Sequence, residues 1–172
     1  AIDGAIMRIL DVFMAIPPLL MAVAVSAALG EGALNSAIAI AMCTIPNFAR
    51  IIRASALTIK SQEYIEAARA CGGRDFKIIW KYLIPNSLAP IMVQSTLQIG
   101  NAILQISMLS FIGLGVQPPT PEWGNMLAVG REFIRDFPPM VLYPGVAIML
   151  TLISFNVLGD GLRDALDPRL KQ

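Results

Sequence analysis

The chain has 172 residues, of which 56% are hydrophobic and 15% are charged, with a net charge of +1. Because soluble domains carry about 25% charged residues, this composition indicates a membrane protein and disfavours a buried, water-soluble helical core. Histidine is absent and Cys43 and Cys71 are the two cysteines, which excludes a histidine base, a histidine metal ligand and a disulfide framework.

Four hydrophobic segments approach or exceed the roughly 20 residues that cross a hydrocarbon core. We expect these spans at about residues 12–29, 34–48, 88–114 and 140–158. The second span is short, and we expect it to continue past Pro46 as a kinked helix. No cleavable signal peptide is visible. The chain starts at Ala1 without an initiator methionine, and its first residues already lead into a span. We therefore expect a fragment of a longer protein.

Charge predicts the orientation of these spans, because loops rich in lysine and arginine lie in the cytoplasm. The segment between the second and third spans is strongly basic, and the C-terminal tail carries further basic residues. We expect the central segment and both ends to be cytoplasmic, and residues 30–32 and 113–139 to face outward. At the cytoplasmic end of the first span, the spacing of Arg8 and Asp11 predicts a local ion pair.

We call residues 61–85 the docking loop. Their sequence predicts two short helices joined by a sharp turn. Ser61 is placed to cap the first helix, and the Gly72–Gly73 pair ends it, because glycine tolerates a left-handed backbone. Pro85 is expected to stop the second helix, which Asp75 is placed to cap. The predicted apolar faces are Tyr64, Ala67, Ala68 and Cys71 on the first helix, and Phe76, Ile79, Trp80 and Leu83 on the second.

The docking loop supports two interpretations from its residues alone. It forms either a knob that inserts into a groove of a partner protein or an amphipathic hairpin that rests on lipid headgroups. Its basic side chains allow the same two interpretations, since they fit either an acidic cleft or lipid phosphates. These residues are Arg69, Arg74, Lys77 and Lys81.

Four carboxamide residues recur along the third span. Gln94, Gln98, Asn101 and Gln105 follow the spacing i, i+4, i+7 and i+11, which places them on one helix face. Carboxamides in hydrocarbon are unfavourable unless they are paired or hydrated. We interpret this face as the lining of a translocation path. The alternative is hydrogen bonding between helices, at about 0.6 kcal/mol per contact.

Several motifs carry a resemblance to a known family. Glu66-Ala67-Ala68, then Gly72 and a proline thirteen residues later, resemble the EAA loop of ABC importer permeases, although Tyr82 stands where the loop consensus has isoleucine. Residues 3–17, 109–124 and 156–169 resemble the C-type permease of dipeptide, oligopeptide and nickel importers.

The resemblance implies an all-α membrane protein, part of a type I ABC importer transmembrane helical bundle, with about four spans and cytoplasmic coupling helices. Residues 1–172 would be the C-terminal part of the permease transmembrane domain, in the inner membrane and without the first two of six spans. The residues that would couple the chain to a separate ATPase are Glu66, Ala67, Ala68, Gly72 and Pro85.

The implied function is a non-catalytic permease subunit for di- or oligopeptides. Its implied partners are ATPase subunits, a second permease, an extracytoplasmic substrate-binding protein and membrane lipid. Nickel or another metal chelate is the alternative cargo, and a stand-alone channel or scaffold is the alternative from another class. The sequence has no phosphate loop, catalytic set, metal-ligand cluster or aromatic-rich basic patch, so we expect no cofactor, metal or nucleic acid.

Overall fold

The computed structural model describes residues 2–166, and all regular secondary structure within them is helical. This confirms the all-α prediction. The helices are α1 (Ile2–Met14), α2 (Pro18–Leu29), α3 (Ala33–Lys60), α4 (Glu63–Ala70), α5 (Asp75–Ile78), the π-helical segment η1 (Ile79–Leu83), α6 (Ile84–Phe111), α7 (Trp123–Gly130), the short 3-10 helix η2 (Arg131–Phe133) and α8 (Pro139–Leu166).

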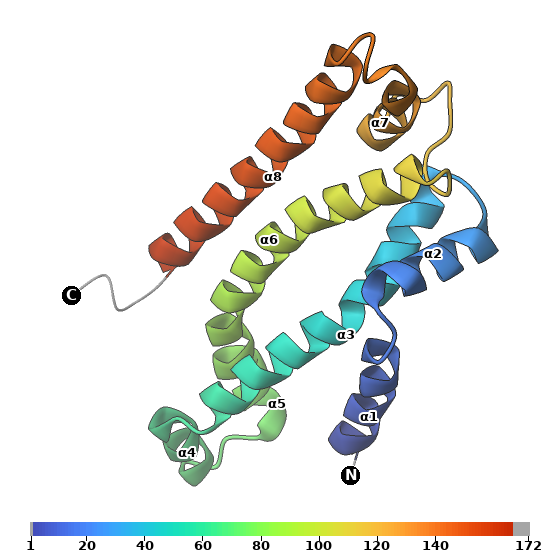
Figure 1. Cartoon of the computed structure of the whole chain (residues 1–172). Helices are drawn as coiled ribbons and strands as arrows, with labels where there is room; N and C mark the ends of the chain where they lie inside the picture. The colour runs from blue at the N-terminus through green and yellow to red at the C-terminus, as the bar shows by residue number, and fades with distance from the viewer. Residues whose placement is uncertain (1, 167–172) are drawn as a thin grey trace.

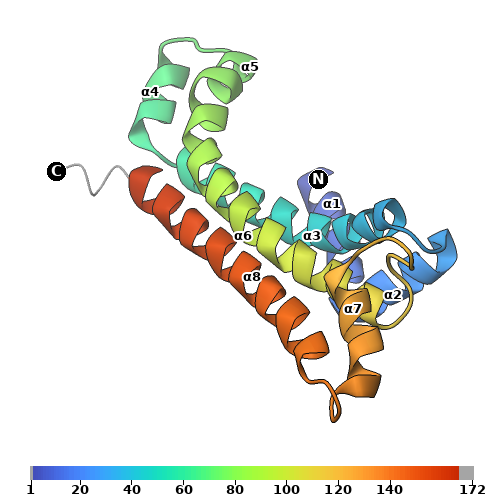
Figure 2. The same ribbon diagram turned by 90° about the horizontal axis from the view of Figure 1, so that it is seen from above.

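Three helices of 28 residues each, α3, α6 and α8, form the frame of the molecule. At about 1.5 Å per residue each is about 42 Å long. Helix α6 lies between α3 and α8 (Figures 1 and 2). Small residues let α6 and α8 approach closely. A Cβ added to Gly100 of α6 would lie 3.0 Å from Leu152 Cδ1 of α8, and a Cβ added to Gly159 of α8 would lie 2.9 Å from Leu97 Cδ2 of α6.

The predicted spans correspond only partly to these helices. In the described part of the chain, α3 and α8 are long and apolar enough to cross a membrane, and α1 with α2 adds a third span if the two count as one. Helix α6 is uncharged and equally long but does not belong to this set. Its carboxamides lower its mean hydropathy, so two to three of the about four predicted spans stand out by length and composition.

The first span is not one helix. An 86° bend separates α1 from α2 inside the predicted first span, so within residues 12–29 the helix is continuous only from Pro18 to Leu29. Pro17 has an extended backbone, with φ −54° and ψ 129°, because the proline that follows it disfavours the helical conformation. Pro18 then starts α2, where its missing N–H is not needed. By contrast, α3 continues through Pro46 to Lys60, as predicted.

Ion pairs attach α1 to α3. Asp3 accepts hydrogen bonds from Nε and Nη2 of Arg53, each at 2.7 Å, and Asp11 accepts one from Arg50 Nη2 at 2.6 Å. The two aspartates follow one side of α1, and the arginines occupy successive turns of α3. The predicted pair between Arg8 and Asp11 is therefore replaced by a pair between helices, in which the planar guanidinium fits the carboxylate.

At the opposite end of the frame, α7 is clamped to α6. Glu122 caps α7 by accepting a hydrogen bond from the Asn125 backbone N–H at 2.8 Å. The same carboxylate accepts one from Ser107 Oγ, also at 2.8 Å. Gly124 lies directly against the Ser107 carbonyl, in space that no Cβ could occupy. This contact explains why glycine stands after the tryptophan in the Pro-Glu-Trp-Gly motif.

Replacement of Gly124 by alanine tests this close contact. A Cβ at this position would overlap backbone atoms of Ser107, so helix α7 must move away from α6. We expect the Gly124→Ala protein to lose about 1–3 kcal/mol of stability, measured as a lower midpoint of thermal unfolding in detergent. Gly161→Ala is the matched control, because a Cβ there meets no atom within 4 Å. Equal midpoints for the two variants would contradict the clamp.

Candidate functional site

The docking loop is fixed to the frame by its own hydrophobic cluster. Ile59, Ile65 and Ile78 are buried together, and Ala68, Tyr82 and Leu83 pack against them. A second cluster, built from Ala22, Ile40 and Leu109, lies elsewhere in the frame. Helices α4 and α5 lie at the far end of α3 and α6 from α7 (Figures 1 and 2). The loop is thus packed against the end of α3, and its last residues lead directly into α6.

The buried face of α4 differs from the predicted one. Ile65 is 1% exposed and Ala68 is half-buried, whereas Tyr64, Ala67 and Cys71 are exposed. The branched side chain of Ile65 fills the space beside Ile59 and Ile78 better than the small residues could, so burial follows size rather than the predicted stripe.

The capping predictions were also wrong. Gln62 is the N-cap residue of α4 and Arg74 that of α5. Ser61 instead closes α3, where its Oγ donates to the Thr58 carbonyl at 2.9 Å, because α3 continues up to the residue before it. Asp75 is the first residue of α5 rather than its cap.

The turn after α4 agrees with the prediction. Gly72 has a φ of +79°, a backbone conformation that favours glycine. Its N–H donates to the Arg69 carbonyl at 2.9 Å, and the Gly73 N–H donates to the Ala68 carbonyl at 3.0 Å. A Cβ on Gly73 would lie 2.6 Å from that carbonyl oxygen. Both glycines are required for a turn this tight.

Pro85 does not stop the second helix, which corrects the prediction. Helix α5 passes through η1 directly into α6, and Pro85 lies in the first turn of α6. Because Pro85 has no N–H to donate, the regular hydrogen-bond ladder cannot continue at this point. The helix widens instead, and the Ile84 N–H donates to the Ile79 carbonyl five residues earlier. The docking loop and α6 therefore form one continuous helical path.

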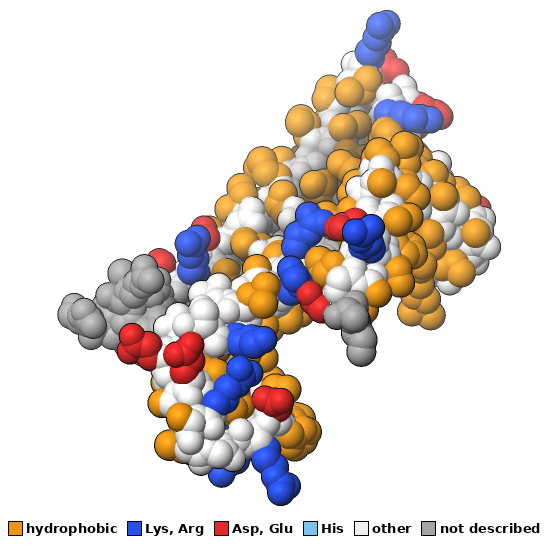
Figure 3. All heavy atoms as spheres, turned by 90° about the horizontal axis from the view of Figure 1, so that it is seen from below, with side chains coloured by type: hydrophobic (Ala, Val, Ile, Leu, Met, Phe, Trp, Pro, Cys, Tyr) orange, Lys and Arg blue, Asp and Glu red, His pale blue; other side chains and the backbone are white. Residues whose placement is uncertain are grey.

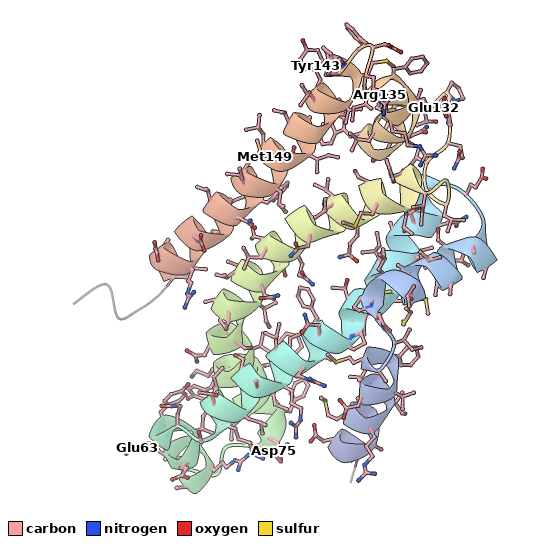
Figure 4. The ribbon with its side chains drawn as sticks, viewed as in Figure 1. Glu63, Asp75, Glu132, Arg135, Tyr143 and Met149 are labelled. Atoms are coloured by element: carbon pink, nitrogen blue, oxygen red, sulfur yellow. The ribbon has the colours of Figure 1, made fainter. Side chains whose placement is uncertain are left out.

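The predicted coupling residues lie on the surface of this loop. Glu66, Ala67, Gly72 and Pro85 are exposed, and Ala68 is half-buried against the cluster. Figure 4 shows Glu63 and Asp75 on the same end of the molecule. Arg69 forms an ion pair with Asp75 across the turn at 3.8 Å. Four of the five residues are therefore open to solvent, and Ala68 packs on the cluster of Ile59, Ile65 and Ile78.

The predicted carboxamide face divides between two cavities. Gln98, Asn101 and Gln105 line a cavity of about 320 Å³. Gln94 lies instead in a cavity of about 630 Å³ between the first turns of α6 and the end of α8, together with Arg163. The structure thus brings three of the four side chains together and sets the fourth apart.

Helix α3 also contributes polar groups to the smaller cavity. These groups were not predicted from the sequence. Cys43, Thr44 and Asn47 line it opposite the three carboxamides. The signal was present in the sequence, because Cys43 and Asn47 are four residues apart and so share a face of an apolar helix. The joint between α1 and α2 closes the cavity with apolar side chains, among them Phe13 and Met14.

The cavity combines amide and hydroxyl groups with apolar side chains and is uncharged, since no acidic or basic side chain is among the described residues that line it. Asn101 Nδ2 donates to Gln98 Oε1 at 3.2 Å. The remaining amide groups can donate to and accept from a bound molecule or water. Such a set of groups can solvate the amides of a neutral backbone without fixing a charge.

Known proteins resemble the chain over its whole length. The family model of the binding-protein-dependent transport system inner membrane component matches residues 1–172. The chain is 49% identical over 170 residues to a dipeptide transport system permease protein of Alkalihalophilus pseudofirmus, covering 99% of the chain and 56% of that relative. It is 48% identical over 169 residues to glutathione transport system permease proteins of Salmonella typhimurium and Escherichia coli, covering 98% of the chain and 56% of each relative. The chain therefore spans about half the length of these relatives.

Cysteine substitution tests whether water reaches the carboxamide-lined cavity. With Cys43 and Cys71 replaced by serine, we expect Gln98→Cys, Asn101→Cys and Gln105→Cys to react with a charged thiol reagent in intact membranes. The reaction needs a hydrated thiolate. We expect water to reach a cysteine at these positions in the cavity, whereas lipid excludes water. Ile99→Cys is the control, because Ile99 is 47% exposed on α6 but does not line this cavity. If none of the three positions reacts, the cavity is closed to water.

Proposed function

The chain belongs to the family of inner membrane components of binding-protein-dependent transport systems, and from this membership we propose that it forms part of the translocation path of an ATP-driven importer for di- or oligopeptides. Residues 1–172 form the C-terminal part of the permease transmembrane domain. The chain contributes the path, and partner subunits hydrolyse ATP. The observation that carries the proposal is the uncharged cavity lined by Gln98, Asn101 and Gln105.

The cargo is a peptide rather than nickel or another metal chelate. The relatives named above transport dipeptides and glutathione. Uncharged amide donors and acceptors match the repeating amide groups of a peptide backbone, whatever its side chains. A path with this lining passes many sequences and holds none of them tightly. Gln94, beside Arg163, lies toward the docking loop and lines the next section of the same path.

Coupling to the ATPase runs through the docking loop. Glu66, Ala67, Ala68 and Gly72 contact an ATPase subunit on the cytoplasmic side. The cluster of Ile59, Ile65 and Ile78 carries the displacement of α4 into α3 and α6. Pro85 and η1 keep the loop and α6 on one helical path, so closure of the paired ATPases moves the helix that bears the carboxamides. This is the physical basis of alternating access in the proposal.

The remaining partners follow from the orientation that the charge distribution predicts. The basic docking loop and the C-terminus lie in the cytoplasm, and residues 113–139 face outward toward a substrate-binding protein. A second permease completes the path, and lipid covers the outer surfaces of α3 and α8. Arg169 and Lys171, which belong to the predicted basic tail, lie outside the described residues.

Charge reversal at the exposed glutamate of α4 tests the coupling. In the full-length permease, we expect Glu66→Arg to lower the amount of ATPase that co-purifies by about tenfold or more, the effect of losing an interface hot spot. Glu132→Arg is the control, since it makes the same change at an exposed residue of the opposite end. Full recovery of ATPase with Glu66→Arg, or transport without any ATPase, would favour the alternative of a stand-alone channel or scaffold.

A further inference from the structure

Two aromatic side chains at the start of the α5–η1–α6 path are open to solvent. Phe76 is 73% exposed and Trp80 is 60% exposed. Their ring centroids are 6.1 Å apart, with the planes tilted by 54°. Lys77 and Lys81 alternate with them along the helix, and Lys81 Nζ lies 5.7 Å from the centroid of the Tyr82 ring. We call these four residues, Phe76, Lys77, Trp80 and Lys81, the aromatic–basic patch.

The packing of α6 on α8 fixes the depth of this patch relative to the bilayer. Charged side chains avoid the hydrocarbon, and on α8 the apolar run ends at Leu158, two residues before Asp160. Gly159 packs against Leu97 and Thr96 of α6. The edge of the hydrocarbon on the docking-loop side therefore lies near Thr96 and Leu97, about two helical turns inside the start of the third span predicted from the sequence.

The patch lies well beyond that edge. At about 1.5 Å per residue, the stretch from Thr96 back to Trp80 covers about 24 Å of helix. The headgroup layer on each side of a bilayer is only about 5–8 Å thick. Figures 1 and 2 both show α5 at the far end of α6, beyond the end of α8 where the described chain stops. Lipid headgroups therefore do not cover the patch, and the hairpin resting on lipid is disfavoured for these residues.

Aromatic side chains that remain exposed in water mark a protein interface. The charge of the patch indicates its partner. Lys77 and Lys81 are in no ion pair within residues 2–166, and the nearby Asp75 pairs with Arg69. An apolar centre between two positive charges is complementary to an apolar surface flanked by carboxylates. Figure 3, a view from below, shows basic side chains on the docking-loop end and apolar ones beside them.

We propose that the aromatic–basic patch is a second contact surface for the ATPase subunit, distinct from the surface of Glu66 to Gly72, and that it takes an apolar, acid-flanked surface of that subunit. The ATPase is the occupant because the patch continues the proposed docking surface across the Gly72 turn, and in this respect the inference depends on the proposed function. The two contacts act differently on the permease. Movement of α4 reaches α6 through the Ile65 cluster, whereas the patch is on the same continuous helical path as α6.

Affinity measurements on the full-length permease in nanodiscs test the patch. We expect the double variant Phe76→Ala/Trp80→Ala to bind the purified ATPase at least about tenfold more weakly, as for buried aromatic anchors. Lys77→Glu/Lys81→Glu should weaken binding and reduce its dependence on salt. Phe133→Ala/Phe137→Ala is the matched control, because it removes two exposed rings from the opposite end. Unchanged affinity in the aromatic variant overturns the inference, provided that its thermal unfolding matches that of the control.

The same preparation separates this inference from the proposed function. If Glu66→Arg abolishes ATPase binding and the patch variants do not, only the second contact is wrong. If Glu66→Arg also leaves binding unchanged, the proposed function fails. A spin label at Lys77→Cys reports the surroundings directly: we expect it to be accessible to a water-soluble nickel complex, and to become protected when the ATPase is added. Accessibility to oxygen alone, as for a site in lipid, would overturn the inference.

Discussion

Close packing of α6 against α8 sets the position of every other part of the molecule. Gly100 leaves room for the Leu152 side chain of α8, and Gly159 leaves room for the Leu97 side chain of α6, so the two helices approach closely. Lipid supplies no hydrophobic force that drives helices together, so association relies on such van der Waals contact. This contact fixes which residues of α6 lie level with the apolar part of α8. It thereby places the carboxamides within the frame and the docking loop outside it.

The polar cavity lies between two regions of firm packing. On one side Ala22, Ile40 and Leu109 hold α2, α3 and α6 together, and on the other Ile59, Ile65 and Ile78 hold the docking loop. Helix α3 runs through both regions, and α6 is joined to the second region through η1. In the proposed function, a displacement of the docking loop passes along these two helices to the groups that line the cavity, because packed protein interiors deform little.

Features that depend on neighbours in the sequence were predicted well. The helical class, the passage of α3 through Pro46 and the turn at Gly72 follow from composition and backbone preference. Features that depend on distant partners were not. Asp11 pairs with a residue 39 positions away, and the periodicity of α4 does not reveal that Ile65 is the residue that meets α3 and α5. The prediction that Pro85 ends the helix was wrong because the π-helical segment η1 accommodates the missing N–H of this proline. The tertiary packing of the two flanking helices decides this outcome.

The attachment of α1 has a consequence for the size of molecules the cavity can hold. Its contacts with α3 include two ion pairs open to solvent, which contribute little net free energy, and it is joined to α2 through a bend at Pro17, where the backbone leaves the helical conformation. Phe13 and Met14, near the end of α1, form one wall of the cavity. That wall is the least costly one to displace. In the proposed peptide path, α1 is therefore the wall expected to move first when a bulkier molecule enters the cavity, while α3 and α6 stay in place.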